Sequence, residues 1–124
     1  MTYFITGATG FIGKRLVRKL LARRGSVVHF LVRDASPERL APLYEYWGVD
    51  DKRAVPVVGD ISKPGLGLKA AERKALSGKI RHCFHLAALY DLSADAAAQI
   101  AVNVEGTRNV VTFANDIKAG CFHH

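Results

Sequence analysis

The sequence predicts an α/β fold, a doubly wound parallel sheet with its strands in the order 3-2-1-4-5. Short apolar runs typical of buried strands alternate along the chain with segments of helical periodicity. Such alternation favours parallel strands joined by right-handed helical crossovers. A glycine-rich turn separates the first strand from the first helix. The 124 residues, 49% of them hydrophobic, suffice for one compact core.

Five runs rich in apolar, β-branched or aromatic residues predict strands, at 2–6, 27–32, 54–58, 80–87 and 121–124. The first run is followed directly by the glycine turn, the second is mainly β-branched and aromatic, and the third ends at Gly59 and Asp60. The fourth follows a further glycine, Gly78. Because the fifth run lies at the end of the sequence, we expect the sheet to be incomplete on that side.

Four segments predict helices, at 11–23, 37–47, 68–76 and 94–114. Apolar residues recur at 3.6-residue spacing in the first, and Gly25 follows as its stop. Ser36 and Pro37 are typical of the N-cap and first position of the second helix. Gly78 closes the third helix, and the last is a long alanine-rich stretch.

Composition excludes several classes of protein. The formal net charge is +7, but much of the excess lies in residues 14–24, where it describes the solvated face of a helix. No aromatic stacking platform accompanies it, so we expect an anionic small molecule rather than nucleic acid as partner. The chain has no leader pattern, no run of about 18 apolar residues, and two cysteines that suit a reducing compartment. We therefore expect a cytoplasmic protein.

The glycine turn predicts a dinucleotide site. A pyrophosphate needs backbone N–H groups aimed at it, a helix N-terminus and no side chain in the way. Gly7 would allow the tight turn, Gly10 the close approach of the phosphates, and Gly13 the packing of helix on sheet. The residues expected to hold the cofactor here are Gly7, Thr9, Gly10, Phe11, Ile12 and Gly13.

Four motifs in order, TGATGFIG (6–13), GDIS (59–62), HLAA (85–88) and NVEGT (103–107), resemble those of the extended short-chain dehydrogenase/reductases, which have a Rossmann-type fold. The resemblance implies that Asp60 and Ile61 flank the adenine and that Ala87 and Ala88 line the path to the nicotinamide. Asp60 could instead form an Asx-turn or helix cap. Asn103 could support a buried polar network behind the cofactor or serve as a helix-to-strand tie.

The end of the second strand favours NADP(H) over NAD(H). The family's NAD-preferring members tend to carry an acid at the position that corresponds to Val32, and Arg33 stands beside it. We expect the Arg33 guanidinium to clamp the 2′-phosphate, with Lys14 or Arg15 as helpers. The alternatives are a surface arginine paired with Asp34, or Asp34 accepting from the ribose of NAD.

No catalytic residue is assigned. Reductases of this family use a Tyr-x-x-x-Lys pair for proton transfer, and none of Tyr3, Tyr44, Tyr46 or Tyr90 has a lysine four residues later. We therefore expect residues 1–124 to be the N-terminal part of a single NAD(P)-binding domain. The substrate-binding and catalytic part would lie outside this chain, and the chain alone would be inactive.

The motifs GDI, LGL, H-x-AA and NVxGT narrow the resemblance to the thioester reductases and fatty acyl reductases. It implies that the complete enzyme uses NADP(H) to reduce an acyl thioester or related carbonyl. A sugar-nucleotide epimerase or dehydratase relative, a dihydroflavonol-type reductase and a non-catalytic NADP-sensing module remain alternatives.

A metal site is the other alternative. Cys83 and His85 alternate on one strand, as do Cys121 and His123 on the next, and four such ligands could hold zinc. Packing in the core is the favoured interpretation, because both faces of a parallel sheet are buried. We therefore expect no metal.

Overall fold

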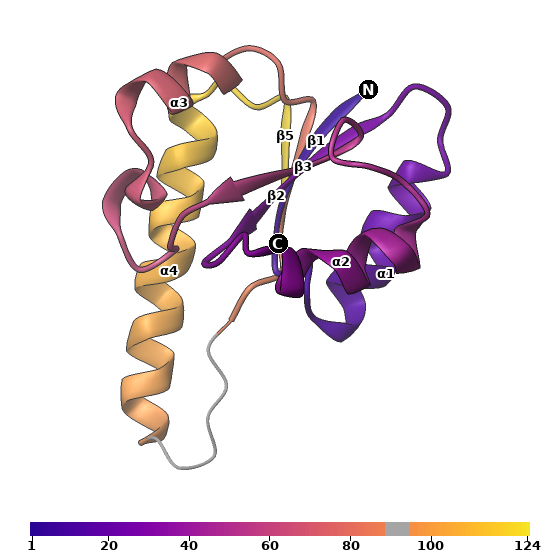
Figure 1. The fold of residues 1–124 in the computed structure, drawn as a ribbon. Helices are drawn as coiled ribbons and strands as arrows, with labels where there is room; N and C mark the ends of the chain where they lie inside the picture. The colour runs from indigo at the N-terminus through magenta and orange to yellow at the C-terminus, as the bar shows by residue number, and fades with distance from the viewer. Residues whose placement is uncertain (89–94) are drawn as a thin grey trace.

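A computed structural model describes residues 1–88 and 95–124. The elements run in the order β1 (Thr2–Thr6), α1 (Phe11–Leu21), β2 (Val27–Val32), α2 (Pro37–Trp47), β3 (Ala54–Val58), η1 (Pro64–Gly67), α3 (Ala70–Leu76), β4 (His82–His85), α4 (Ala96–Asp116) and β5 (Cys121–His123). The sheet is parallel throughout and has the order β3-β2-β1-β4-β5, which confirms the predicted fold class (Figure 1).

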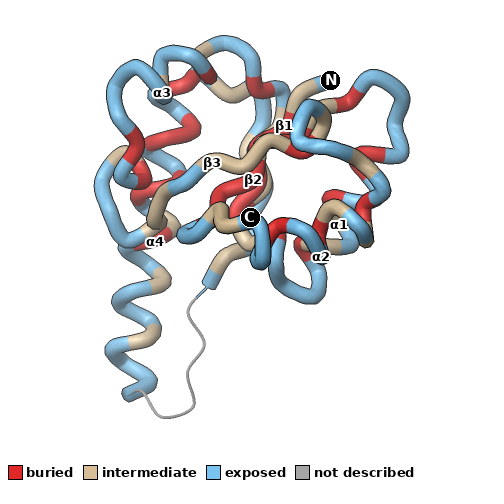
Figure 2. The backbone as a smooth tube through the Cα atoms, in the orientation of Figure 1, coloured by how far each residue is buried: buried red, intermediate tan, exposed pale blue. Residues whose placement is uncertain are grey.

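Helices cover the two faces of the sheet with separate hydrophobic clusters. On one face α1 and α2 pack against Tyr3, Ile5 and Phe30, and the Trp47 ring meets Phe30 edge-on with centroids 5.2 Å apart. On the other face α4 and η1 bury Phe4, whose ring centroid lies 4.9 Å from that of Phe113. Alternate strand residues therefore face opposite layers, as the period of a strand requires. Figure 2 shows this buried centre and an exposed first half of α4.

Some predicted boundaries were wrong at the element ends. The fourth strand is shorter than 80–87. Leu86 still donates its N–H to the carbonyl of Thr6 at 3.1 Å, but the N–H of Ala87 donates to the Thr6 side chain instead of continuing the ladder. The third helix begins at Ala70 rather than at residue 68, since the 3₁₀ turn η1 precedes it. The first helix ends at Leu21, and α4 extends to Asp116. The expected start of α4 at residue 94 lies outside the described residues.

The β3 edge of the sheet contains a proline. The N–H of Gly59 donates to the carbonyl of Val32, so the odd-numbered residues of β3 face β2. Pro56 is even-numbered, and its nitrogen faces away from the sheet. It costs no ladder hydrogen bond there, which is the position that a strand proline tolerates.

Candidate functional site

The glycine turn lies at the carboxyl edge of the sheet, between β1 and α1. Gly7 has φ +82°, and a Cβ there would lie 2.6 Å from the backbone nitrogen of Ala87. A Cβ on Gly13 would overlap the carbonyl oxygen of Gly7. Both positions therefore need glycine because backbone approaches backbone, as the sequence analysis proposed for a tight turn and a closely packed helix.

The N-terminus of α1 is open to an anion. Its N-cap is Gly10, which has no side chain to accept from the first turn. Helical geometry leaves the N–H groups of Phe11, Ile12 and Gly13 without intrahelical acceptors. Both Phe11 and Ile12 are exposed, and with Gly10 and Gly13 they line a small cavity of about 280 Å³. Partial positive charge thus faces an accessible space.

A larger cavity of about 760 Å³ lies beside this turn, at the ends of β1, β2, β3 and β4. Its lining includes seven of the predicted cofactor residues, namely Gly7, Thr9, Arg33, Asp60, Ile61, Ala87 and Ala88. Asn103 lines neither cavity and is half-buried on α4. The fold thus brings four segments distant in sequence to one concave site, at the strand ends where such sheets bind ligands.

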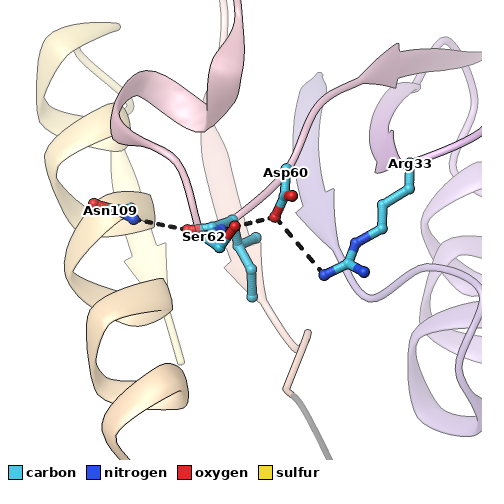
Figure 3. Close-up of polar contacts among 5 residues, drawn as sticks. Arg33, Asp60, Ser62 and Asn109 are labelled. Atoms are coloured by element: carbon cyan, nitrogen blue, oxygen red, sulfur yellow. Dashed lines mark hydrogen bonds and ion pairs between the residues drawn. The ribbon is translucent and has the colours of Figure 1, made fainter.

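Arg33 extends across this cavity toward Asp60 (Figure 3). Its guanidinium lies 3.7 Å from a carboxylate oxygen of Asp60, and the Arg33 side chain is 76% exposed. The same Asp60 oxygen accepts from the backbone N–H of Ser62 at 2.9 Å. This hydrogen bond, supplemented by the nearby charges of Arg33 and Lys63, lowers the pKa of Asp60. Asp60 therefore stays ionised while it shapes the turn after β3.

Asp34 does not pair with Arg33, contrary to one alternative from the sequence. It accepts from the backbone N–H of Ser36 at 2.9 Å, and its second oxygen lies 3.5 Å from the Nε of Arg39. Arg39 stands in the first turn of α2 and lines the large cavity with Arg33 and Asp34. Two cations therefore flank the end of β2, each within 4 Å of a carboxylate.

Lys14 and Arg15, the residues expected to assist Arg33, contact aromatic rings instead of the large cavity. The ammonium of Lys14 lies 4.5 Å from the centroid of the Tyr46 ring, in the contact between α1 and α2. Arg15 covers the Phe11 ring at 3.8 Å and donates to the Phe11 carbonyl at 2.9 Å. Neither lines the large cavity, whereas Arg39 does. Sequence reasoning missed Arg39, although its place in the first turn after the second strand was a usable signal.

A second asparagine on α4 supports the turn after β3. The Nδ2 of Asn109 donates to the carbonyl of Ile61 at 2.8 Å (Figure 3). Gly106 faces the Ile61 side chain, where a Cβ would come within 3.0 Å of Cδ1. Asn109 is the asparagine bonded to Ile61, while the polar network or helix-to-strand tie expected for Asn103 stays a prediction. That contact fixes the backbone that presents Asp60 and Ile61 to the cavity.

A buried network joins β1, β4 and α4 beneath the site. The Oγ1 of Thr6 accepts from the N–H groups of Leu86 and Ala87, both at 3.2 Å, and forms a hydrogen bond of 2.6 Å with Nδ1 of His85. The Nε2 of His85 forms a hydrogen bond of 3.2 Å with Oγ1 of Thr107. Burial lowers the pKa of His85 to about 4, with a smaller contribution from His124. The network holds the backbone of Ala87 against the glycine turn.

The strand register separates the residues of the alternative metal site. Cys83 is paired with Phe122 and Phe84 with His123, so Cys121 and His123 face the α1 side while Cys83 and His85 face α4. Burial raises the pKa of Cys83 to about 12. Among the described residues no three metal-binding side chains converge. The four-ligand arrangement is therefore wrong.

The part of the chain that the structure describes lacks two further features. No helix there is long and apolar enough to cross a membrane. The Tyr-x-x-x-Lys pair is lacking from the sequence at each of its four tyrosines, and Tyr90 lies outside the described residues. The described part therefore holds no pair of this kind for proton transfer.

Several known proteins are similar to this chain in sequence and fold. An NAD-binding family model described as "Male sterility protein" matches residues 5–124. A component of the linear gramicidin synthase of Brevibacillus parabrevis is 35% identical over 118 residues, which cover 89% of this chain and 2% of that protein. The fatty acyl-CoA reductase wat of Drosophila melanogaster is 30% identical over 128 residues, covering 92% of this chain and 25% of the enzyme.

A solved structure is also similar to this chain, in both fold and sequence. The terminal R domain from the myxalamid PKS-NRPS biosynthetic pathway superposes with a TM-score of 0.80 and 32% identity over 98% of this chain. This chain spans 33% of the solved domain and smaller shares of the two curated relatives.

Proposed function

Because this chain belongs to the NAD-binding family described as male sterility protein, a group of extended short-chain reductases, we propose that it forms the NADP(H)-binding part of a reductase. The proposed substrate of the complete enzyme is an acyl thioester or a related carbonyl compound. Residues 1–124 would be the N-terminal part of one cofactor-binding domain, and substrate binding and proton transfer would reside in other parts of the protein.

The cavities fit the parts of a dinucleotide. In this proposal the N–H groups at the start of α1 hold the pyrophosphate in the small cavity, where Gly7, Gly10 and Gly13 leave room. The adenine lies against Asp60 and Ile61 in the large cavity, beyond the end of β3. Ala87 and Ala88 line the route toward the reacting end, and their small side chains leave it open. Asn103 acts further from the cofactor, in the helix behind this route.

The choice of NADP(H) rests on the cations at the end of β2. Val32 stands at the place of the NAD-selective acid, and Arg33 and Arg39 both line the cavity beyond it. Arg33 is 76% exposed, and its ion pair to Asp60 is long, at 3.7 Å, so most of its five donors are free. A 2′-phosphate would bring two or more strong acceptors within reach of that guanidinium.

The bound cofactor would supply the hydride for the reduction. This chain's residues would bind and orient it: the glycine turn sets the pyrophosphate, and Thr6 with His85 fixes the backbone of Ala87 beside the reacting end. The relatives named as a fatty acyl-CoA reductase and as the terminal R domain of a PKS-NRPS pathway support a thioester substrate.

The test is calorimetric titration with NADPH and NADH. Arg33→Ala should weaken NADPH binding about ten- to a hundredfold, corresponding to about 1.5–3 kcal/mol for a charge-assisted contact, and leave NADH nearly unchanged. Arg39→Ala should act in the same direction. Arg81→Ala removes an exposed arginine at the opposite edge of the sheet and should change neither affinity. Equal weakening for both cofactors, or a parent chain that prefers NADH, would refute the NADP(H) proposal.

A further inference from the structure

Three of the four sequence motifs each contribute one residue to the buried network beneath the site. Thr6 begins TGATGFIG, His85 begins HLAA and Thr107 ends NVEGT. These residues lie on β1, β4 and α4, and His85 is hydrogen-bonded to both of the others, at 2.6 Å to Thr6 and at 3.2 Å to Thr107. None of the three lines either cavity. Any contribution that they make to cofactor binding therefore acts through other residues.

The Thr6 end of this network holds a backbone segment that lies between the two cavities. The Oγ1 of Thr6 accepts from the N–H groups of Leu86 and Ala87, both at 3.2 Å. Leu86 lines the small cavity, Ala87 lines the large one, and Gly7 lines both. A Cβ on Gly7 would lie 2.6 Å from the Ala87 nitrogen, so the two backbone segments are already in close contact. A small shift of Leu86 and Ala87 would therefore change both cavities.

The Thr107 end of the network connects this segment to α4. Thr107 is half-buried, and its Oγ1 is the partner of the Nε2 of His85. Because Thr6 is the partner of the Nδ1, both ring nitrogens of His85 are bonded and the orientation of the ring is fixed. Without the Thr107 hydroxyl, the ring would be held at one nitrogen only, and the terminal torsion of a histidine side chain is soft. The position of Leu86 and Ala87 therefore depends on α4.

The same helix is tied to the adenine side of the site through a different residue. The Nδ2 of Asn109 donates to the carbonyl of Ile61 at 2.8 Å (Figure 3). Thr107 and Asn109 are two residues apart, which places them about 200° apart around the helix axis. Asn109 thus reaches the turn after β3, while Thr107 reaches β4. Helix α4 has two separate ties, one to each half of the site.

We propose that Thr107 and His85 are positioning residues for the nicotinamide half of the dinucleotide, an inference that rests on the proposed function. Through Thr6 they hold Leu86 and Ala87, and Ala87 lines the route proposed for the reacting end. Asn109 positions the adenine half instead. Because NADPH and NADH carry the same nicotinamide half, loss of the network should affect the two alike, unlike the loss of Arg33.

The test compares NADPH and NADH with adenosine 2′,5′-bisphosphate, which lacks the nicotinamide half, by calorimetric titration of the full chain. Thr107→Val removes the hydroxyl and keeps the branched shape. It should weaken NADPH and NADH each about three- to tenfold, as expected for one lost hydrogen bond, and change the bisphosphate less than about twofold. Asn109→Leu should weaken NADPH and the bisphosphate by the same factor.

Two further variants serve as controls for Thr107→Val. Thr107→Ser keeps the hydroxyl and should restore the parent affinities, which a loss of side-chain volume alone would not allow. Thr112→Val is the same substitution at an exposed position of α4 and should leave the affinities for all three ligands unchanged. If Thr107→Val fails to fold, as judged by urea unfolding, Thr107→Ala gives the same comparison.

Equal weakening of NADPH and of adenosine 2′,5′-bisphosphate in Thr107→Val would overturn the proposal, because it would show a general structural role of the network. Unchanged affinities for all three ligands would overturn it as well. In both cases the parent chain still binds NADPH, so the proposed function stands. A parent chain that binds neither NADPH nor NADH would instead refute the proposed function, and this inference with it.

Discussion

Two arginines lie at opposite ends of the parallel strands and differ in their hydrogen-bonding partners. The amino edge is the side where the strands begin, and the carboxyl edge is the side where they end. At the amino edge, Arg53 is half-buried and donates to the carbonyls of Leu21, Arg23 and Ser26 and to the Ser26 hydroxyl, at 2.7–3.1 Å. At the carboxyl edge, Arg33 is 76% exposed and lies 3.7 Å from the Asp60 carboxylate, its one ion pair among residues 1–88 and 95–124. A guanidinium that donates to several backbone carbonyls stabilises the fold, whereas an exposed one with a single long ion pair is available to a ligand.

The largest expected effect on stability is at the amino edge. Arg53→Met keeps the aliphatic stem but removes the donors that join the end of α1 to the starts of β2 and β3. The free energy of unfolding should fall by about 3 kcal/mol, since hydrogen bonds from a charged group contribute about 1.5–3 kcal/mol and three carbonyls lose a donor. Urea unfolding measures the loss, and Arg53→Lys should lose less. A fall below about 1 kcal/mol would mean that water replaces the guanidinium.

At the carboxyl edge, the residue that holds the backbone in place is His85, and its contribution to the free energy of unfolding depends on pH. Its pKa is about 4 when folded and about 6.5 when unfolded, so between these values the unfolded chain binds the proton more tightly. Stability should therefore be full above pH 6.5 and fall as the pH drops toward 4, by about 2–3 kcal/mol. His85→Gln, measured by thermal unfolding across this range, should have a shallower dependence. An identical slope in both proteins would contradict the assignment.

The smallest expected effect on stability is at Arg33. Arg33→Met should change the free energy of unfolding by less than about 0.5 kcal/mol, because an exposed pair at this distance contributes little. The same urea titration as for Arg53 gives the direct comparison. A loss above about 1 kcal/mol would make Arg33 a structural tie, and the contrast between the two edges would fail.

The fold was predictable because its signals are local. Alternating apolar runs identified all five strands, and the crossover rule gave their order. The glycine turn was also readable, since its spacing reflects backbone contacts such as that between Gly7 and Ala87. The wrong boundaries were those decided by a residue distant in sequence, as where the Thr6 hydroxyl accepts from the N–H of Ala87 after β4.

The parts of the site that the sequence analysis missed depend on which way side chains face. Lys14 and Arg39 are both cations near the expected phosphate, but Tyr46 attracts Lys14 to the contact between α1 and α2, while Arg39 faces the cavity. Asn103 and Asn109 lie less than two turns apart on α4, and only the packing of α4 against η1 decides which one reaches Ile61. Sequence spacing carries no information on which asparagine reaches Ile61, whereas the place of Arg39 in the first turn of α2 was a usable signal.

The proline in β3 determines at which edge strand the sheet can be extended. An added strand needs free N–H and carbonyl groups along the edge that it joins. At the β3 edge Pro56 offers no N–H to such a strand, so pairing would be interrupted in its middle. At the other edge β5 contains no proline and has a ladder with β4 on one side only. Any strand that extends this sheet, from the same protein or from a neighbour, is therefore directed to β5.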